Sequence, residues 1–250
     1  MAAERPLAER AARRAAFFDI DRTLLASNSA ASFARYMREV GIARRRDLVV
    51  AGWYLGLYRM GLLEPSQALV RSADVLRGKP EEWLVEHCAR WYERDVRRDL
   101  RGGARAHIEH HRRAGHLVVL LSSSTCYLGN LLGDELDIEH RLVNRLVLDD
   151  HGRFTGAFVQ PLCYGHGKRW HATRFAEEHG VDLAESFFYT DSVTDLGMLE
   201  LVGHPRVVAP DPRLAREARR RGWPIVDLDD QRATPDVGIT RAGATRGRGR

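Results

Sequence analysis

The stretch AAFFDIDRTLLAS, residues 15–27, places two acids at the end of an apolar run. A short apolar run with paired aromatic residues is typical of a buried strand, and a strand over 14–20 is predicted. Burying a carboxylate is costly unless the group is paired or bound to a metal. Asp19 and Asp21 therefore mark the end of this strand as a candidate functional site.

The composition is that of an ordinary globular chain, with 250 residues, 44% hydrophobic and 29% charged. The net charge of +5 comes from the ends, because residues 1–14 carry +2 and residues 231–250 carry +4. The body between them is near neutral, whereas a nucleic-acid-binding protein should carry a basic face on its folded body. Nucleic acid is therefore not an expected partner, and residues 1–13 and 231–250 are predicted to be tails, the second one disordered.

The three cysteines lie far apart and form no CxxC pair, which favours a reducing, cytoplasmic environment. The amino-terminal residues lack the apolar core of a signal peptide. The most apolar run, residues 48–63, is shorter than the roughly 20 residues that a membrane span needs, and Arg59 interrupts it. No transmembrane segment is predicted. A buried helix is favoured there, with contact to a membrane surface as the alternative.

Strand and helix patterns alternate along most of the chain. Further strands are predicted at 116–124, 186–192, 205–210 and 223–228, with a β-hairpin over 141–159. About four helices are predicted between residues 28 and 114, and one of them carries a stripe formed by Leu84, Cys88 and Trp91.

This order predicts an α/β fold, a Rossmann-like parallel sheet with helices on both faces. The core would comprise 14–26 and 103–230, and residues 27–102 would form an inserted, all-helical cap.

Polar residues follow several of the predicted strands. Asp19 and Asp21 follow the first strand, Ser122 follows the apolar run of the second, and Asp191 follows SFFYT, residues 186–190. Functional residues of such sheets collect beyond the carboxyl ends of the strands, so we expect these groups to converge. Lys168, at the start of a helix, is the candidate cation.

Four motifs together resemble the haloacid dehalogenase superfamily, over about residues 14–228. They are Asp19-Ile-Asp21-Arg-Thr23, Ser122 after a hydrophobic strand, Lys168 before a helix, and Asp191 and Asp195 in DSVTD. The long helical insert after the first motif is similar to the C1 cap of subfamily IB, the phosphoserine-phosphatase-like branch.

The resemblance implies a Mg²⁺-dependent phosphomonoester hydrolase. Asp19 would be the nucleophile that forms an aspartyl-phosphate, and Asp21 the proton carrier. Mg²⁺ would be held by Asp19, by the main-chain carbonyl of Asp21 and by Asp191, with Asp195 acting from nearby. The residues implied in binding phosphate or substrate are Thr23, Ser122, Ser123, Lys168, Thr194 and Arg71. Ser123 or Ser124 would replace Ser122 as the phosphate ligand if the strand ends later.

The substrate is left open by three departures from the phosphoserine branch. Asn28 stands where that branch has a Glu, Thr194 replaces a usual Asn, and Arg71 only approximates the position of its cap Arg. A phosphoserine-like or amino-alcohol phosphate is expected. A phosphotransferase or mutase, or a phosphate-binding protein without turnover, is the alternative. Asp21 argues against a dehalogenase, and the oligomeric state is not predicted.

Two other features are interpreted as structural. His107, His110 and His111 share one helical face but lack a further ligand, so a solvated helix is expected rather than a metal site. Arg22 stands where the superfamily most often has Gly, and a structural or cap-facing role is favoured over a phosphate contact.

Overall fold

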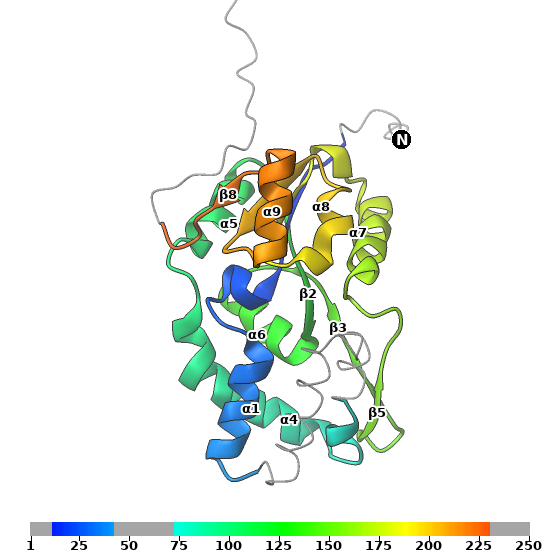
Figure 1. Cartoon of the computed structure of the whole chain (residues 1–250). Helices are drawn as coiled ribbons and strands as arrows, with labels where there is room; N and C mark the ends of the chain where they lie inside the picture. The colour runs from blue at the N-terminus through cyan, green and yellow to red at the C-terminus, as the bar shows by residue number, and fades with distance from the viewer. Residues whose placement is uncertain (1–11, 43–72, 231–250) are drawn as a thin grey trace, which may run out of the picture.

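The computed structural model describes residues 12–42 and 73–230 (Figure 1). The apolar run at 48–63, Arg71 and the predicted tail at 231–250 lie outside the described residues.

A six-stranded sheet forms the centre of the structure, in the order β3-β2-β1-β6-β7-β8, and every pairing in it is parallel. The predicted parallel α/β fold is confirmed. The strands are β1 (Ala15–Phe18), β2 (Leu117–Thr125), β3 (His140–Asn144), β6 (Phe187–Thr190), β7 (His204–Val208) and β8 (Ile225–Val226).

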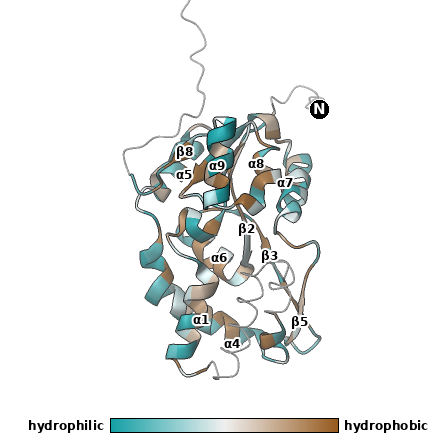
Figure 2. Cartoon of the chain, in the orientation of Figure 1, coloured by the Kyte–Doolittle hydropathy of each residue, from teal (hydrophilic) through white to brown (hydrophobic). Residues whose placement is uncertain are grey.

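Helices cover both faces of the sheet because successive residues of β1 point to opposite sides. Phe18 packs with α5 (Ala104–Arg113) and α6 (Cys126–Glu135) on one face. Phe17 packs with helices on the other, namely α7 (His166–His179), α8 (Leu196–Leu199) and α9 (Pro212–Arg221). Figure 2 shows brown strands between helices whose outer faces are largely teal.

The predicted cap segment contributes two helices to the described residues, α1 (Ser29–Glu39) and α4 (Glu81–Trp91). Asn28 begins α1, since its side chain accepts a hydrogen bond from the Ala31 amide. The stripe predicted on α4 is buried, with Leu84, Cys88 and Trp91 each at most 5% exposed. The segment also contains short helical turns, η3 (Ala73–Leu76), η4 (Tyr92–Val96) and η5 (Arg97–Asp99).

The predicted hairpin over 141–159 is wrong in its first half. Residues 140–144 form β3, which joins the parallel sheet, and only β4 (Leu146–Leu148) pairs antiparallel with β5 (Phe154–Phe158). The apolar pattern continues from β3 into β4, which is why the sequence predicts the two strands as one. Asn144 ends β3, and its side chain forms hydrogen bonds with other segments of the chain. The hairpin packs against α4 and the start of α6.

The prediction of a solvated helix at 107–116 is also wrong. His107 is 1% exposed and His111 is fully buried against the sheet. The His111 ring lies 2.8 Å (Nε2) from the Tyr189 hydroxyl and 2.9 Å (Nδ1) from Nδ1 of His116. Because the ring surface of histidine packs like an aromatic side chain, this face of α5 is buried despite its polar composition.

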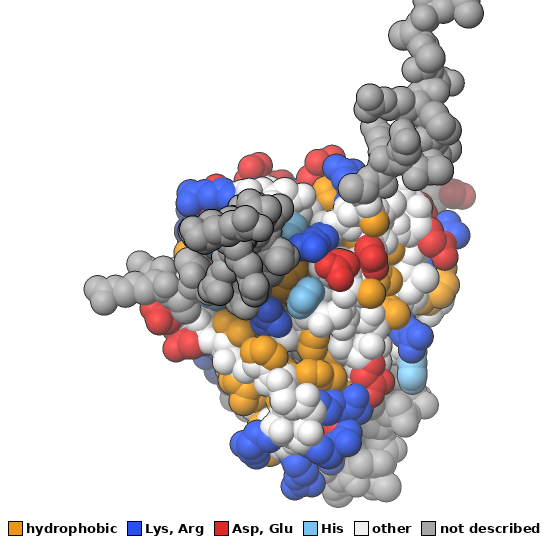
Figure 3. All heavy atoms as spheres, turned by 90° about the horizontal axis from the view of Figure 1, so that it is seen from above, with side chains coloured by type: hydrophobic (Ala, Val, Ile, Leu, Met, Phe, Trp, Pro, Cys, Tyr) orange, Lys and Arg blue, Asp and Glu red, His pale blue; other side chains and the backbone are white. Residues whose placement is uncertain are grey.

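Among the described residues, no helix is long and apolar enough to cross a membrane. The face of the molecule that bears the amino ends of the strands shows acidic, basic and apolar side chains interspersed (Figure 3).

Candidate active site

The first candidate residue stands where β1 gives way to a tight turn. The Asp19 amide donates to the Tyr189 carbonyl at 3.0 Å, which continues the pairing of β1 with β6 for one more residue. The chain then turns through η2 (Ile20–Leu24), in which Arg22 has a left-handed backbone with φ of 56°. A residue with a Cβ pays about 1–3 kcal/mol for such a conformation.

The Arg22 side chain is exposed, and its positive charge offsets part of the rise in the pKa of Asp191. Its carbonyl accepts a hydrogen bond from Arg101 at 3.2 Å. The preference for a structural or cap-facing role stays a prediction.

The start of α7 depends on two glycines. Gly165 has a φ of 52°, which favours glycine, and a Cβ on Gly167 would lie 1.7 Å from the Leu162 carbonyl oxygen. The loop can therefore pack tightly beneath the first helical turn, which carries Lys168. This lysine is one of only two in the chain, and it is 2% exposed.

Lys168 joins two of the predicted acids. Its Nζ lies 2.9 Å from Oδ1 of Asp19 and 2.7 Å from Oδ2 of Asp195. Asp195 also accepts a hydrogen bond from the Thr190 hydroxyl at 2.6 Å. Although burial lowers the pKa of Lys168, the charges of Asp19 and Asp195 raise it overall, so this ammonium stays protonated.

Asp191 is the third buried carboxylate of this cluster, after Asp19 and Asp195, and Lys168 is its ammonium group. Asp191 is 7% exposed, and burial followed by the charges of Asp19 and Asp195 raises its pKa to about 7. The cluster therefore holds more negative charge than Lys168 compensates.

Asp21 points away from Lys168, towards α1 and β2. Its Oδ1 accepts the Ser29 amide at 2.6 Å, and its Oδ2 accepts the Ser124 hydroxyl at 3.3 Å. Burial raises the pKa of Asp21 despite these hydrogen bonds, and the charge of Asp19 adds to the effect. The two acids of the first motif thus have different hydrogen-bond and ion-pair partners.

The serines lie within a strand rather than after one. We expected Ser122 to follow its strand, but β2 runs on to Thr125. Ser122 is fully buried, and its hydroxyl accepts a hydrogen bond from the Ser124 amide at 3.3 Å. Ser123 is partly exposed.

Within the described residues, the hydroxyls of Thr23 and Thr194 form no hydrogen bond with the acids around Lys168. Thr23 is fully buried, and within the described ranges its hydroxyl has no hydrogen-bond partner. Thr194 is exposed, and its hydroxyl lies 2.9 Å from that of Ser192. Arg71 is outside the described residues.

The donors around Asp19 fit a hard divalent cation. Nowhere in residues 12–42 and 73–230 do three His, Cys, Asp or Glu side chains form a metal-binding group. Mg²⁺ needs fewer, because it commonly keeps several waters and takes only one or two carboxylates. The buried Oδ1 of Asp19 forms an ion pair with Lys168 but accepts no hydrogen bond from any described residue, and Asp191 shares the excess negative charge. Asp195 is instead occupied by Lys168 and Thr190.

Sequence reasoning missed three residues that shape this site: Thr190, which holds Asp195, and the pair Asn144 and Cys163. It named Ser124 only as an alternative phosphate ligand, whereas Ser124 contacts Asp21. Burial raises the pKa of Cys163 to about 12, so its thiol stays protonated. The run Ser122–Ser124 was a usable signal, because three consecutive serines at a strand end offer more than one hydroxyl. Asn144 gave none, because its partners come from distant segments.

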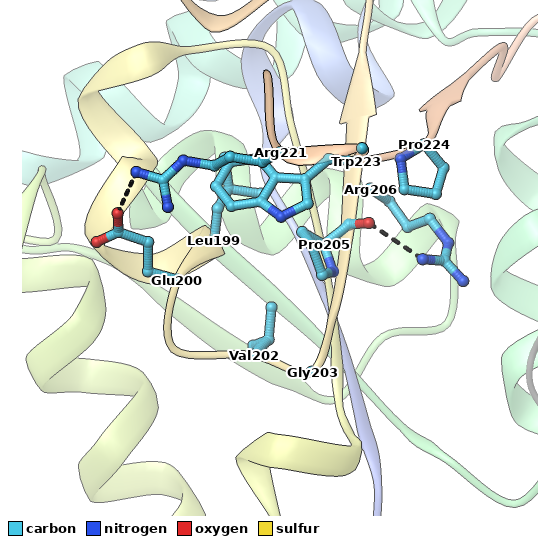
Figure 4. Close-up of a pocket in the computed structure, with 10 residues that line it drawn as sticks. Leu199, Glu200, Val202, Gly203, Pro205, Arg206, Arg221, Trp223 and Pro224 are labelled. Carbon is cyan, nitrogen blue, oxygen red and sulfur yellow. Dashed lines mark hydrogen bonds and ion pairs between the residues drawn. The ribbon is translucent and has the colours of Figure 1, made fainter. Parts of the chain in front are cut away.

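A surface cavity lies away from these acids. It measures about 470 Å³ and is lined by the end of α8, the start of β7 and the end of α9. Figure 4 shows Trp223 at its centre, beside the ion pair of Arg221 with Glu200. This cavity lies at the amino end of β7, whereas the acids follow the carboxyl ends of β1 and β6.

Comparison with known proteins identifies the family. A family model described as haloacid dehalogenase-like hydrolase matches residues 16–200. The chain belongs to this family, and the predicted superfamily and hydrolase class are confirmed.

Curated relatives match over most of the chain. An "inhibition of morphological differentiation protein" from Streptomyces azureus is 33% identical, with 86% of this chain and 79% of the relative covered. A "probable phosphatase" from Mycobacterium tuberculosis is 31% identical, with 87% and 76% covered. A "histidinol-phosphatase" from Neisseria meningitidis is 25% identical, with 85% and 98% covered.

Solved structures share the fold. A protein of unknown function from Bordetella pertussis superposes with a TM-score of 0.81 at 26% identity, covering 87% of this chain and all of that one. A phosphoserine phosphatase with an analogue of its phospho-aspartyl intermediate gives a TM-score of 0.65 at 19% identity, covering 88% and 95%.

Proposed function

We propose that the chain is a Mg²⁺-dependent phosphomonoester hydrolase that works through an aspartyl-phosphate on Asp19. The observation that carries the proposal is the buried cluster at the carboxyl edge of the sheet. It sets Asp19 against Lys168 at 2.9 Å and adds two further carboxylates. Family membership and a relative named as a probable phosphatase support the same chemistry.

The first chemical step forms one bond and breaks another at phosphorus. A carboxylate oxygen of Asp19 attacks the phosphoryl group in line with the ester oxygen, and the bond to that ester oxygen breaks. Asp21, whose pKa is raised by burial, gives its proton to the departing alkoxide. Asp21 is then a carboxylate.

The second step returns the enzyme to its starting state. Asp21 takes a proton from a water molecule, and the resulting hydroxide attacks phosphorus and displaces Asp19. Lys168 neutralises charge on the phosphoryl oxygens in both steps, and Ser122 is the proposed hydroxyl donor to them.

The residues that would hold Mg²⁺ are Asp19, Asp191 and the main-chain carbonyl of Asp21. When bound, the cation neutralises negative charge so that an anionic phosphate can approach an anionic nucleophile. The excess of carboxylates over ammonium groups in this cluster supports that assignment.

The substrate is proposed only as a class, a small alkyl phosphomonoester. Asn28 stands at the position of the phosphoserine-branch Glu. Its side-chain oxygen accepts a hydrogen bond from the Ala31 amide at the start of α1. An ammonium group of a substrate would have to compete with that hydrogen bond. Amino-alcohol phosphates and phosphoserine therefore belong in the same panel as uncharged alcohol phosphates.

The test is phosphate release from a panel containing p-nitrophenyl phosphate, O-phosphoserine, histidinol phosphate and glycerol phosphate. Wild type and Asp19→Asn are compared with Mg²⁺ and with EDTA, and acid-quenched protein is examined for alkali-labile phosphate. We expect Mg²⁺-dependent release and labelling in the wild type alone. No release from any ester would refute the function, and equal activity of Asp19→Asn would refute the nucleophile. Alcohol released in excess of free phosphate would indicate a phosphotransferase.

A further inference from the structure

A bulge interrupts β2 beside the candidate active site. Ser122 pairs with Val143 of β3, but the next paired residue is Thr125, opposite Asn144. Ser123 and Ser124 therefore have no partner residues on β3. Bulges of this kind bend a strand and redirect its side chains, and they are common next to active sites.

Side chains replace the backbone hydrogen bonds that the bulge loses. The side-chain nitrogen of Asn144 donates a hydrogen bond to the Ser123 carbonyl at 2.7 Å. The side-chain oxygen of Asn144 accepts a hydrogen bond from the main-chain amide of Cys163 at 2.8 Å. Asn144 is 2% exposed, so both bonds are shielded from water. The Ser124 amide donates to the Ser122 hydroxyl at 3.3 Å. The bulge is therefore held in a defined shape.

That shape directs the Ser124 side chain at Asp21. The Ser124 hydroxyl donates to Oδ2 of Asp21 at 3.3 Å and lies 3.4 Å from the Ser29 hydroxyl. The other oxygen of Asp21 accepts the Ser29 amide at 2.6 Å. The main-chain donor holds Oδ1, and the Ser124 contact at Oδ2 restrains the rotation of the carboxyl group, to which the Ser29 side chain also donates a hydrogen bond.

We propose that Ser124 is a positioning residue, presented by the Ser123–Ser124 bulge, which orients Asp21 for proton transfer to the leaving group. This inference rests on the proposed function, in which Asp21 carries that proton. Ser124 acts through Asp21, because its hydroxyl contacts Oδ2 of that residue. Apo hydrogen bonds of catalytic groups are commonly long and tighten when substrate binds, which accommodates the 3.3 Å separation.

If Ser124 orients Asp21, the effect of removing its hydroxyl should depend on the leaving group of the ester. An alkoxide needs a proton as it departs, whereas p-nitrophenolate departs without one. The ratio kcat/KM depends only on steps up to the first irreversible one. It therefore reports the departure of the alcohol and excludes the later hydrolysis of the aspartyl-phosphate. Misorientation of Asp21 should therefore lower kcat/KM for alkyl esters selectively.

The experiment compares p-nitrophenyl phosphate with the alkyl ester of the panel that the wild type hydrolyses fastest. In Ser124→Ala and Ser124→Gly we expect kcat/KM to fall about tenfold for the alkyl ester and less than about twofold for the aryl ester. Ser124→Thr, which keeps a hydroxyl, should restore most of the alkyl activity. In an Asp21→Asn background, Ser124→Ala should cause no further loss.

Ser186→Ala is the matched control. Ser186 is buried, as Ser124 is, and its hydroxyl accepts a hydrogen bond from the Ala15 amide at 3.0 Å, but it lies at the amino end of β6. Its loss should lower stability without changing the alkyl-to-aryl ratio.

Equal losses on both esters, with no restoration by Ser124→Thr, would overturn the role of Ser124. So would wild-type kinetics in Ser124→Ala, or a wild type that hydrolyses only the aryl ester. A wild type without phosphatase activity on any ester would instead refute the proposed function.

Discussion

Two clusters of buried ionisable groups lie next to the same strand, β6, and behave in opposite ways. At the carboxyl edge, Asp19, Asp191 and Asp195 surround Lys168, and opposite charges keep the ammonium protonated. Behind Tyr189 of β6, His111 is buried against an uncharged hydroxyl. Burial and then the nearby His116 lower the pKa of His111 to about 2, so it stays neutral.

The difference shows what decides the fate of a buried titratable group. Desolvation disfavours charge in both clusters, and only the first supplies countercharges within 3 Å. The first cluster is therefore suited to binding a cation and a phosphoryl group. The second cluster contributes to the packing of the core, and it does so only while its histidines remain neutral. Substitutions in the two clusters should therefore change stability with opposite pH dependence.

The largest effect is expected from Lys168→Met, which removes the only ammonium of the acid cluster. Stability should fall by about 3–5 kcal/mol, because unpaired carboxylates remain buried. Phosphate release should fall at least about a hundredfold. The loss of stability should be larger at pH 8 than at pH 5, where the acids can take up protons instead.

Urea denaturation at both pH values, with phosphate release, measures these losses. Lys79→Met is the matched control, because Lys79 lies in the partly exposed segment before α4, 3.9 Å from the Trp83 ring centre. Similar losses in the two variants would show that the acid cluster does not depend on Lys168.

The next effect is expected at Asp191, through cation binding. A cation that binds only the folded chain at a hundred times its Kd should stabilise it by about 2.7 kcal/mol, or raise Tm by about 5–10 °C. Asp191→Asn should abolish most of this Mg²⁺-dependent shift. Thermal melts with Mg²⁺ and with EDTA measure it, and an undiminished shift in the variant would contradict the assignment of Asp191 as a ligand.

The same variant should also differ from the wild type in the pH dependence of its stability when no metal is bound. The folded pKa of Asp191 is raised to about 7 from an ordinary value of 3.8, so the folded state binds this proton more tightly. Stability should therefore decline as pH rises between these values. Above pH 7 in EDTA, Asp191→Asn should be more stable than the wild type.

A smaller effect, of opposite pH direction, is expected in the histidine cluster. The folded pKa of His111 lies below its unfolded value, so stability is lost as pH falls through about 6.5. At pH 5 the loss from this one residue should be about 2 kcal/mol. His111→Phe should be less stable than wild type at pH 7, because Tyr189 loses a partner, and should lose less stability on acidification.

Denaturation midpoints of His111→Phe and wild type between pH 7 and pH 5 test this prediction. His151→Gln, at an exposed position in the turn of the hairpin, is the control. Parallel pH profiles for His111→Phe and wild type would show that the buried histidine does not set the acid limit.

The sequence predicted the acid cluster and missed the histidine cluster for a physical reason. Carboxylates at the end of an apolar strand are conspicuous, because a buried acid requires compensation, and the parallel sheet follows from strand and helix alternation. The segment around His107 and His111 contains few aliphatic residues, so its pattern indicated a solvated helix. Which histidine nitrogens meet a hydroxyl depends on tertiary packing, and so do the β2 bulge and the contacts of Asn144. Local sequence carries no signal for any of these.

The smallest effect is expected where a single neutral hydrogen bond is changed, which gives a scale for the charged clusters. Asn28 accepts the Ala31 amide at 3.0 Å and begins α1, next to the Ser29 amide that holds Asp21. Asn28→Ala should cost about 1 kcal/mol, while Asn28→Asp, an equally good cap, should stay within a few tenths of wild type. Urea denaturation measures both. A loss in Asn28→Asp as large as in Asn28→Ala would mean that the contribution of residue 28 is not capping, because Asp supplies the same acceptor oxygen to the start of α1.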